Sequence, residues 1–118
     1  MAVADFETAL DKSTQIDLTA IGRVSGRKTV RPVWFVRQGD TLYLLPVSGS
    51  DSQWYKNLVK TPAIRLAADG AEYSGTARPV TDQRAVSQVV GKFSAKYGAG
   101  QIAEYYPHPD VAVEVPLR

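Results

Sequence analysis

Residues 16–36 read IDLTAIGRVSGRKTVRPVWFV, and this stretch decides the fold expected for the chain. Apolar residues alternate with polar ones over residues 16–21 and recur through residues 30–36, as is typical of strands. Gly22 and Gly26 give the connecting segment the freedom that a turn requires. The stretch therefore predicts two paired strands joined by a turn.

The turn between these strands carries a high positive charge. Arg23, Arg27 and Lys28 lie in it, and Arg31 follows just inside the second strand. A turn needs conformational freedom but no charge, so these cations are either solvated surface residues or the contacts of an anion. The formal net charge of +2 is too small to indicate nucleic-acid binding, which is typical of a broader basic excess. Any anion is therefore expected to bind locally, at this turn.

The rest of the chain continues a strand-rich pattern with helices between the strands. Further strands are predicted over residues 42–45, 63–68, 71–80 and 111–117, with hairpin turns at residues 38–40 and at Asp69-Gly70. Helices are predicted over residues 3–10 and 54–60. A third helix is predicted to begin after a cap at Thr81 or Asp82 and to end at Gly98. Its apolar stripe consists of Val86, Val89, Val90, Phe93 and Tyr97. Six strands joined mostly by tight hairpins predict a mainly β, α+β protein: a small antiparallel barrel or curled sheet whose ends are closed by helices.

Composition narrows the class of protein. A chain of 118 residues with 44% hydrophobic and 22% charged residues fits one domain over residues 1–118. No apolar run approaches the roughly 20 residues of a membrane-spanning helix, and the opening MAVADFETALDK has acids where a secretory signal has basic residues. The absence of cysteine from the sequence fits a reducing compartment. We expect a cytoplasmic protein with no membrane span and no nucleic-acid partner.

Two kinds of chemistry find little support in the sequence. His108 is the only histidine and lies between two prolines, which is too little for a histidine metal cluster or a Ser-His-Asp site. A nucleotide-hydrolase phosphate loop is rejected because the segment from Gly22 to Gly26 is one residue too short and leads into a strand instead of a helix. Metal and hydrolase functions are therefore not predicted.

Three segments carry a resemblance to a known family. They are IGRVSGRKTVRPVWFV, GDTLYLLPVSGSDSQWYKNL and PAIRLAADGAEYSGTARPV, which follow one another in order from about residue 18 to residue 80. Together they resemble the deazaflavin (F-420)-dependent nitroreductase and quinone reductase family, which is related to the flavin-binding pyridoxamine-phosphate-oxidase-like proteins. The resemblance implies a six-stranded antiparallel split β-barrel, similar to FMN-binding proteins, that forms a homodimer.

The resemblance also implies a cofactor site. In that family the turn holds the phosphate-bearing tail of coenzyme F-420, and the segment before W-Y-x-N-L holds its ring. This implies tail contacts at Arg23, Ser25, Gly26, Arg27, Lys28 and Thr29, and ring contacts at Pro46, Val47, Ser48, Gly49, Trp54, Tyr55 and Asn57. Trp54 also fits a purely structural role, because aromatic residues at a helix start are usually core residues. Val24 departs from the family, where lysine is common at this position, so FMN remains an alternative cofactor.

The function implied is a reductase that transfers hydride from reduced coenzyme F-420 to a small flat acceptor: a quinone, a nitro compound or an activated alkene. Tyr105 and Tyr106 are expected, with His108, in a proline-bounded loop that covers the acceptor pocket. No catalytic acid or base is predicted, because hydride transfer is the chemistry of the cofactor. An FMN-dependent oxidoreductase, and a non-catalytic carrier of flavin, deazaflavin or haem with the same fold, remain alternatives.

Overall fold

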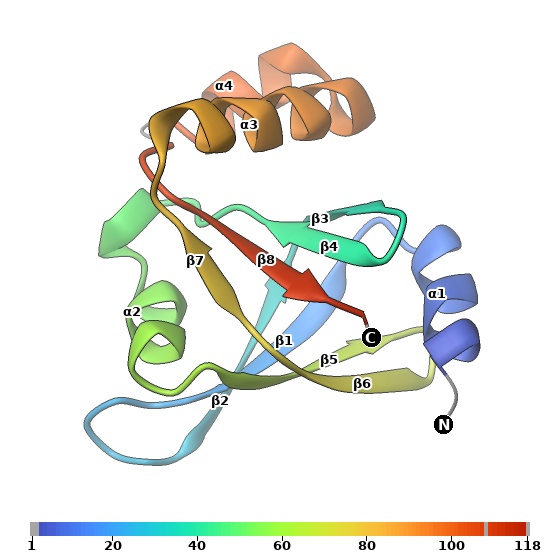
Figure 1. Cartoon of the computed structure of the whole chain (residues 1–118), viewed down its shortest axis with the longest axis vertical. Coiled ribbons are helices and arrows are strands. Elements are labelled where there is room, and N and C mark those ends of the chain that lie inside the picture. Colours follow the sequence, from blue (N-terminus) through green and yellow to red (C-terminus); the bar gives the residue numbers. More distant parts are fainter. Residues whose placement is uncertain (1–2, 108, 118) are drawn as a thin grey trace.

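The computed structural model describes residues 3–107 and 109–117 and consists of two antiparallel sheets with helices around them (Figure 1). The strands are β1 (Ile16–Ile21), β2 (Lys28–Val33), β3 (Phe35–Gln38), β4 (Thr41–Leu44), β5 (Ala63–Ala68), β6 (Ala71–Thr76), β7 (Arg78–Val80) and β8 (Ala112–Pro116). The helices are α1 (Val3–Asp11), α2 (Gln53–Lys60), α3 (Gln83–Tyr97) and α4 (Ala99–Tyr105), with the short 3-10 helix η1 (Gly49–Asp51). The predicted α+β class is confirmed.

The first sheet has the strand order β2-β1-β5-β6, and the second has the order β3-β4-β8-β7. Every pairing is antiparallel; in the first sheet Leu18 lies opposite Arg31 on one side and Leu66 on the other. Ile16, Leu18 and Ala20 are buried, so the predicted alternation of β1 directs one face toward the core. The predicted pairing of residues 16–21 with the following strand is therefore confirmed.

The predicted six-stranded barrel is wrong, because the described residues form eight strands in two separate four-stranded sheets and no closed barrel. The segment predicted as one strand at residues 30–36 breaks at Trp34, and the segment at residues 71–80 breaks at Ala77. Each segment leaves the first sheet at its break and enters the second. At Ala77 the backbone N–H donates to the carbonyl of Pro62 at 2.8 Å.

Prolines accompany both breaks. Pro32 lies in β2 and Pro79 in β7, and each of these strands is at an edge of its sheet. Proline lacks an N–H group, so it is tolerated at an edge where one side of the strand has no ladder partner. The two prolines therefore fit the edge positions that β2 and β7 occupy in their sheets.

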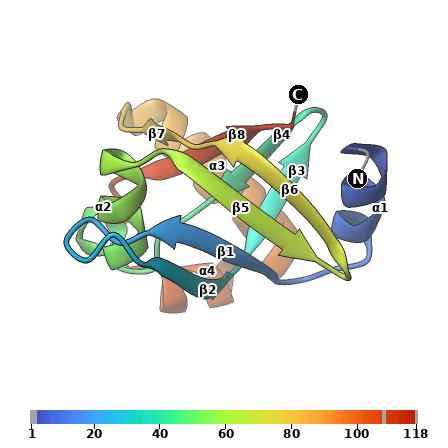
Figure 2. The ribbon, with the colours of Figure 1, turned by 90° about the horizontal axis from the view of Figure 1, so that it is seen from below.

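Two apolar clusters form the core. The larger lies between the sheets and includes Phe6, Leu18, Phe35, Leu66 and Val115. The smaller lies under α3 and α4, which cover the second sheet in Figure 1, and includes Leu45, Val86, Val89, Phe93, Ile102, Tyr106 and Ala112. In Figure 2 the first sheet is turned toward the viewer, and none of the described helices lies in front of its outer face.

The turns and caps follow local chemistry. Asp69 and Gly70 both have positive φ, of 46° and 81°, as the expected tight hairpin turn requires. Of the two candidate caps, Asp82 begins α3: its Oδ2 accepts from the N–H of Ala85 at 3.0 Å. Gly98 ends this helix with φ of 99°. The predicted boundaries of α3 are therefore confirmed.

One helix was not expected. Helix α4 precedes the predicted proline-bounded loop and overlaps it at Tyr105, so Tyr105 is the last residue of a helix and Tyr106 caps its C-terminus. The physical reason is burial, because Ile102 and Tyr106 pack into the cluster beneath α3. His108 lies outside the described residues. None of the described helices is long and apolar enough to cross a membrane.

Candidate cofactor and acceptor site

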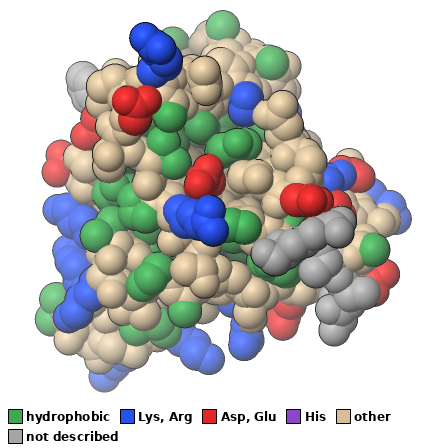
Figure 3. Space-filling view, viewed as in Figure 1, with side chains coloured by type: hydrophobic (Ala, Val, Ile, Leu, Met, Phe, Trp, Pro, Cys, Tyr) green, Lys and Arg blue, Asp and Glu red, His purple; other side chains and the backbone are tan. Residues whose placement is uncertain are grey.

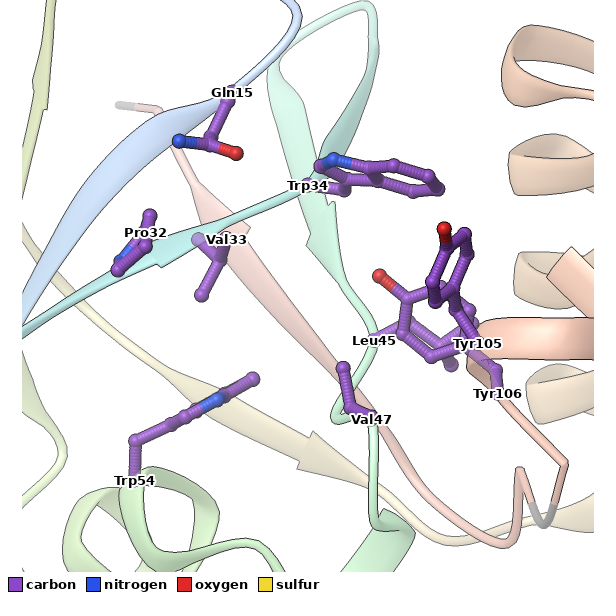
Figure 4. A pocket seen from close by; sticks show the side chains of 9 residues that line it. All are labelled: Gln15, Pro32, Val33, Trp34, Leu45, Val47, Trp54, Tyr105 and Tyr106. Atoms are coloured by element: carbon purple, nitrogen blue, oxygen red, sulfur yellow. The ribbon is translucent and has the colours of Figure 1, made fainter. Parts of the chain in front are cut away.

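A cavity of about 230 Å³ opens where the chain breaks at Trp34 (Figure 4). It is lined by Gln15, Pro32, Val33, Trp34, Leu45, Val47, Trp54, Tyr105 and Tyr106, which come from both sheets, from α2 and from the end of α4. Most of these side chains are apolar or aromatic, and both tryptophans of the chain are among them. A small, largely apolar cavity with a few polar groups is the usual setting for a flat organic ligand.

The cavity brings together residues that were predicted separately. Val47 and Trp54 were expected near the cofactor ring, and Tyr105 and Tyr106 near the acceptor. In Figure 4 Trp54 lies at one end of the cavity, and the two tyrosines lie next to each other at the opposite end, near Trp34. Sequence reasoning missed Trp34, which was interpreted as an ordinary strand residue. Its position beside Pro32, where a strand ladder is weakened, was the available signal.

In the loop before α2, residues 46–52, several backbone N–H groups are already used in hydrogen bonds within the protein, so the loop contacts the cavity through a side chain. Gly49 has φ of 58°, and its N–H donates to the carbonyl of Pro46 at 3.1 Å. The N–H of Ser48 donates to Ser52 Oγ at 3.0 Å, and Ser50 donates to the Asp110 carboxylate through its N–H at 2.9 Å and its hydroxyl at 2.6 Å. These backbone donors are therefore already used. Val47, about half exposed, is the loop residue that lines the cavity.

The three residues predicted from the W-Y-x-N-L segment take different positions on α2. Trp54 is partly buried, packs against the main core and lines the cavity, so it serves the core and the cavity wall at once. Tyr55 is only 7% exposed and belongs to the core, where burial, and then the charge of Asp110, raise the pKa of its phenol. Asn57 is 6% exposed, and its amide oxygen accepts hydrogen bonds from Arg23.

Arg23 anchors the basic turn to α2. Its backbone N–H and its Nη1 donate to Asn57 Oδ1 at 3.1 and 2.8 Å, and its Nη2 donates to Gln53 Oε1 at 2.8 Å. Lys60 Nζ completes the contact by donating to the Arg23 carbonyl at 2.8 Å. Both side-chain acceptors are neutral amides, so the guanidinium is held in place without losing its positive charge.

The other cations of the turn remain open to solvent. Arg27, Lys28 and Arg31 are exposed, and their side chains have no hydrogen-bond or ion-pair partner within residues 3–107 and 109–117. Val24, at the position where the family commonly has lysine, is 94% exposed. Figure 3 shows Lys and Arg side chains gathered along the side of the molecule formed by α2 and this turn. The turn is therefore a fixed, positively charged surface next to the helix that carries Trp54.

The turn itself is closed by its own backbone. Gly22 N–H donates to the Arg27 carbonyl at 2.7 Å, and Gly26 N–H donates to the Gly22 carbonyl at 2.9 Å. A Cβ atom on Gly22 would lie 2.9 Å from Ser25 Oγ, and Gly26 has φ of 71°. Ser25 Oγ already accepts from the N–H of Arg27 at 3.1 Å, and the Thr29 hydroxyl donates to the carbonyl of Ala20 at 3.3 Å.

Tyr106 brings a polar group to the apolar cavity. The residue is 5% exposed, and its hydroxyl has no hydrogen-bond partner among the described residues. Every fully buried polar side-chain atom in the described part of the chain has a partner, so this hydroxyl keeps some accessible surface, and Tyr106 lines the cavity. Burial, and then the neighbouring Tyr97, raise the pKa of Tyr106 to about 12, so at neutral pH the phenol is protonated and can donate a hydrogen bond.

Metal chemistry has no site in the part of the chain that the structure describes. No three His, Cys, Asp or Glu side chains of those residues come close enough together to hold an ion. The site is therefore an apolar aromatic cavity with tyrosine hydroxyls at one end and a basic turn beyond its other end.

Residues 2–106 match the family described as F420H(2)-dependent quinone reductase, and the chain belongs to this family. The resemblance noted in the sequence is thereby confirmed. The family consists of oxidoreductases, and its cofactor is coenzyme F-420. No curated protein matches the chain.

Solved structures show the same fold at low sequence identity. An F420-H2 dependent reductase superposes with a TM-score of 0.68 at 17% identity, covering 86% of this chain and 93% of its own. A putative pyridoxamine 5'-phosphate oxidase from Listeria innocua gives 0.69 at 17% identity, covering 96% and 90%. HutZ, the haem storage protein from Vibrio cholerae, gives 0.71 at 15% identity, covering 98% and 90%. These similarities establish the fold alone.

Proposed function

We propose that this chain is a reductase that uses reduced coenzyme F-420 to reduce a small flat acceptor, with a quinone as the first candidate. The observation that carries the proposal is the cavity lined by Trp54 at one end and by Tyr105 and Tyr106 at the other, with Val47 between them on its wall. A cofactor ring and an acceptor must lie against each other for hydride transfer, and this arrangement offers one apolar site to both.

The residues present fit coenzyme F-420 in charge and in shape. A phosphate-bearing tail is best bound by guanidinium and ammonium groups, and the exposed side chains of Arg27, Lys28 and Arg31 have no partner among the described residues. Arg23 contributes its charge to the same turn from a fixed position. The aromatic face of Trp54 lies on the helix to which this turn is anchored, so the tail and the ring would bind to one connected unit.

The proposed reaction is balanced by one hydride and one proton. When bound, the reduced coenzyme supplies the hydride, and a quinone that accepts it together with one proton from solvent becomes the hydroquinone. Tyr106 is proposed to donate a hydrogen bond from its protonated hydroxyl to the acceptor oxygen, on which negative charge develops. The apolar walls around this contact lower the local polarity, which strengthens such a hydrogen bond.

The test is a titration followed by turnover. We expect F-420 to quench the fluorescence of the two tryptophans saturably, and the loaded protein to reduce 1,4-naphthoquinone. Tyr106→Phe should lower kcat/KM for the quinone about tenfold to a hundredfold, the effect of removing a hydrogen bond to a charged group. The matched control is Tyr73→Phe, because Tyr73 donates to the carbonyl of Pro116 at 2.8 Å, away from the cavity.

The same titration separates the alternatives. Saturable binding of FMN without binding of F-420 would overturn the proposal in favour of a flavin enzyme. Tight binding of haem or F-420 with no reduction of quinone, nitro compound or activated alkene would favour a carrier. We also propose a cytoplasmic location, consistent with the absence of cysteine from the sequence.

We propose in addition that two copies associate about a two-fold axis. The support is the outer face of the first sheet, which none of the described helices covers, and the free edges of strands β2 and β6. Light scattering at micromolar concentration should give twice the chain mass of 12.9 kDa. A single species at the mass of one chain would contradict the proposal.

A further inference from the structure

The break at Trp34 is held by side chains from α3. The hydroxyl of Tyr97 lies 2.9 Å from the carbonyl oxygen of Phe35 and 2.9 Å from that of Thr14, and it accepts from the N–H of Phe35 at 3.2 Å. Lys96 Nζ donates to the same Phe35 carbonyl at 2.8 Å. The backbone groups freed by the strand break are therefore satisfied by the last turn of α3.

The two carbonyls reached by Tyr97 adjoin two residues of the cavity. Thr14 immediately precedes Gln15, and Phe35 immediately follows Trp34; Gln15 and Trp34 both line the cavity. A single phenolic proton can be donated to only one of the two carbonyls at a time, so one hydroxyl is shared between the two chain segments. Tyr97 thus links the backbone beside Gln15 to the backbone beside Trp34.

Tyr97 also contacts the Trp34 side chain directly. The two rings stack with centroids 4.3 Å apart and an interplanar angle of 10°. The Tyr105 ring approaches the same indole edge-on, with ring centroids 5.7 Å apart and an interplanar angle of 75°. The Phe93 ring packs against the Tyr97 ring at a centroid distance of 5.9 Å. The indole of Trp34, which is partly buried, is therefore contacted on one face by Tyr97 and edge-on by Tyr105.

We infer that Tyr97 is a positioning residue, which fixes Trp34 as a rigid wall at the acceptor end of the cavity and so sets which acceptors fit. The acceptor part of this inference rests on the proposed function; the fixing of Trp34 does not. Two contacts act together: the hydroxyl fixes the backbone next to Gln15 and Trp34, and the ring fixes the indole. A flat acceptor that stacks on a pre-organised aromatic surface binds without the cost of ordering that surface.

Two substitutions separate the contacts. Tyr97→Phe keeps the stacked ring but removes the hydroxyl that bonds Phe35 and Thr14, and Tyr97→Leu removes both. Tyr73→Phe is the matched control, because it removes a similar hydroxyl-to-carbonyl bond of 2.8 Å far from Trp34. All three variants lose stability, so stability alone cannot separate positioning from a purely structural role.

The first measurement needs neither cofactor nor acceptor. In a Trp54→Phe background Trp34 is the sole tryptophan, and its acrylamide quenching and fluorescence anisotropy report how firmly the indole is held. We expect quenching to increase and anisotropy to decrease in the order control, Tyr97→Phe, Tyr97→Leu. Quenching and anisotropy in Tyr97→Leu equal to those of the Tyr73→Phe control would overturn the inference, whatever reaction the protein catalyses.

The second measurement concerns the acceptor, with Trp54 present. Loss of one aromatic stack should raise the KM of Tyr97→Leu for 1,4-naphthoquinone about two- to tenfold, with the affinity for F-420 unchanged within about twofold. An equal loss of F-420 affinity would show a general loosening of the site and would overturn the inference. If the wild-type chain reduces no acceptor, the proposed function fails, and the fluorescence result still decides whether Tyr97 fixes Trp34.

Discussion

Replacing Asn57 by alanine removes the acceptor of two hydrogen bonds that hold the basic turn, from the N–H and the Nη1 of Arg23. A neutral bond contributes about 0.5 to 1.5 kcal/mol and a bond to a charged group about 1.5 to 3 kcal/mol. Arg23 is only partly buried, so water replaces part of the loss, and we expect the lower sum, about 2 kcal/mol, in the free energy of unfolding. Urea denaturation of the Asn57→Ala variant measures this loss.

The companion variant Asn57→Asp tests the charge of the turn apart from its anchoring. Aspartate keeps an oxygen acceptor at the same position, so the free energy of unfolding should change by less than in Asn57→Ala. Its carboxylate, however, offsets the guanidinium charge that the neutral amide preserves. Loss of one charge-assisted contact corresponds to about a tenfold weaker affinity for F-420. The affinity should also depend less on salt than in the wild type.

The assay is an F-420 titration by tryptophan fluorescence at low and at high salt, beside urea denaturation of each variant. Gln53→Ala is the internal comparison, because Gln53 accepts only one bond from Arg23, at 2.8 Å. The reasoning is refuted if Asn57→Asp binds F-420 with wild-type affinity and wild-type salt dependence. In that case the charge of Arg23 does not contribute to binding the tail.

Other predictions concern single groups. Arg27→Ala should raise the dissociation constant for F-420 about tenfold to a hundredfold, whereas the control Arg84→Ala, at another exposed arginine, should leave it unchanged. If both variants bind F-420 with the same affinity, Arg27 is only a solvated surface residue. Because burial raises the pKa of Tyr106 from 10.0 to about 12, the folded chain keeps a proton that the unfolded chain loses between these values. Stability is therefore full below pH 10 and falls above it by up to about 1.4 kcal/mol per pH unit, and a Tyr106→Phe variant with the same slope in alkaline denaturation would contradict this. Asp82→Ala should cost about 1 kcal/mol through loss of the α3 cap, and an unchanged melting temperature would show that the cap contributes nothing.

Local patterns predicted the parts of the fold that local chemistry controls. The alternation in residues 16–21 predicted β1 correctly because a one-residue change of register would expose Ile16, Leu18 and Ala20. The turn at Asp69-Gly70 was predictable because two successive residues there need positive φ. Neither feature depends on a distant partner.

The strand break at Trp34 depends on a partner far along the chain. Residues 30–36 have a mostly apolar pattern, and apart from Pro32 nothing within that segment separates β2 from β3. The hydrogen bonds that stabilise the break come from Tyr97, 62 residues away from Phe35. Similarly, no helix was predicted for the residues of α4, and burial of Ile102 under α3 accounts for this helix.

The candidate site was predictable as a set of segments but not in its details. Sequence resemblance identified the basic turn and the segment around Trp54, yet it gave Arg23, Arg27 and Lys28 one shared role. The structure separates them: Arg23 bonds to Asn57, 34 residues away, whereas the side chains of Arg27, Lys28 and Arg31 have no bonding partner among the described residues. A hydrogen bond across such a separation is a property of the fold, and the residue types alone do not reveal it.

The cavity and the failure of the barrel prediction have the same physical origin. A strand that ran unbroken through Trp34 would stay in one sheet and continue its alternation of buried and exposed side chains. Because the chain instead leaves the first sheet at Val33 and enters the second at Phe35, the Trp34 indole projects where the two sheets separate, and the cavity opens there. Backbone groups released by the break then require partners, and Tyr97 and Lys96 supply them. The strand break at Trp34 is thus the structural basis of the proposed site. Such departures from the local sequence pattern are expected at functional sites.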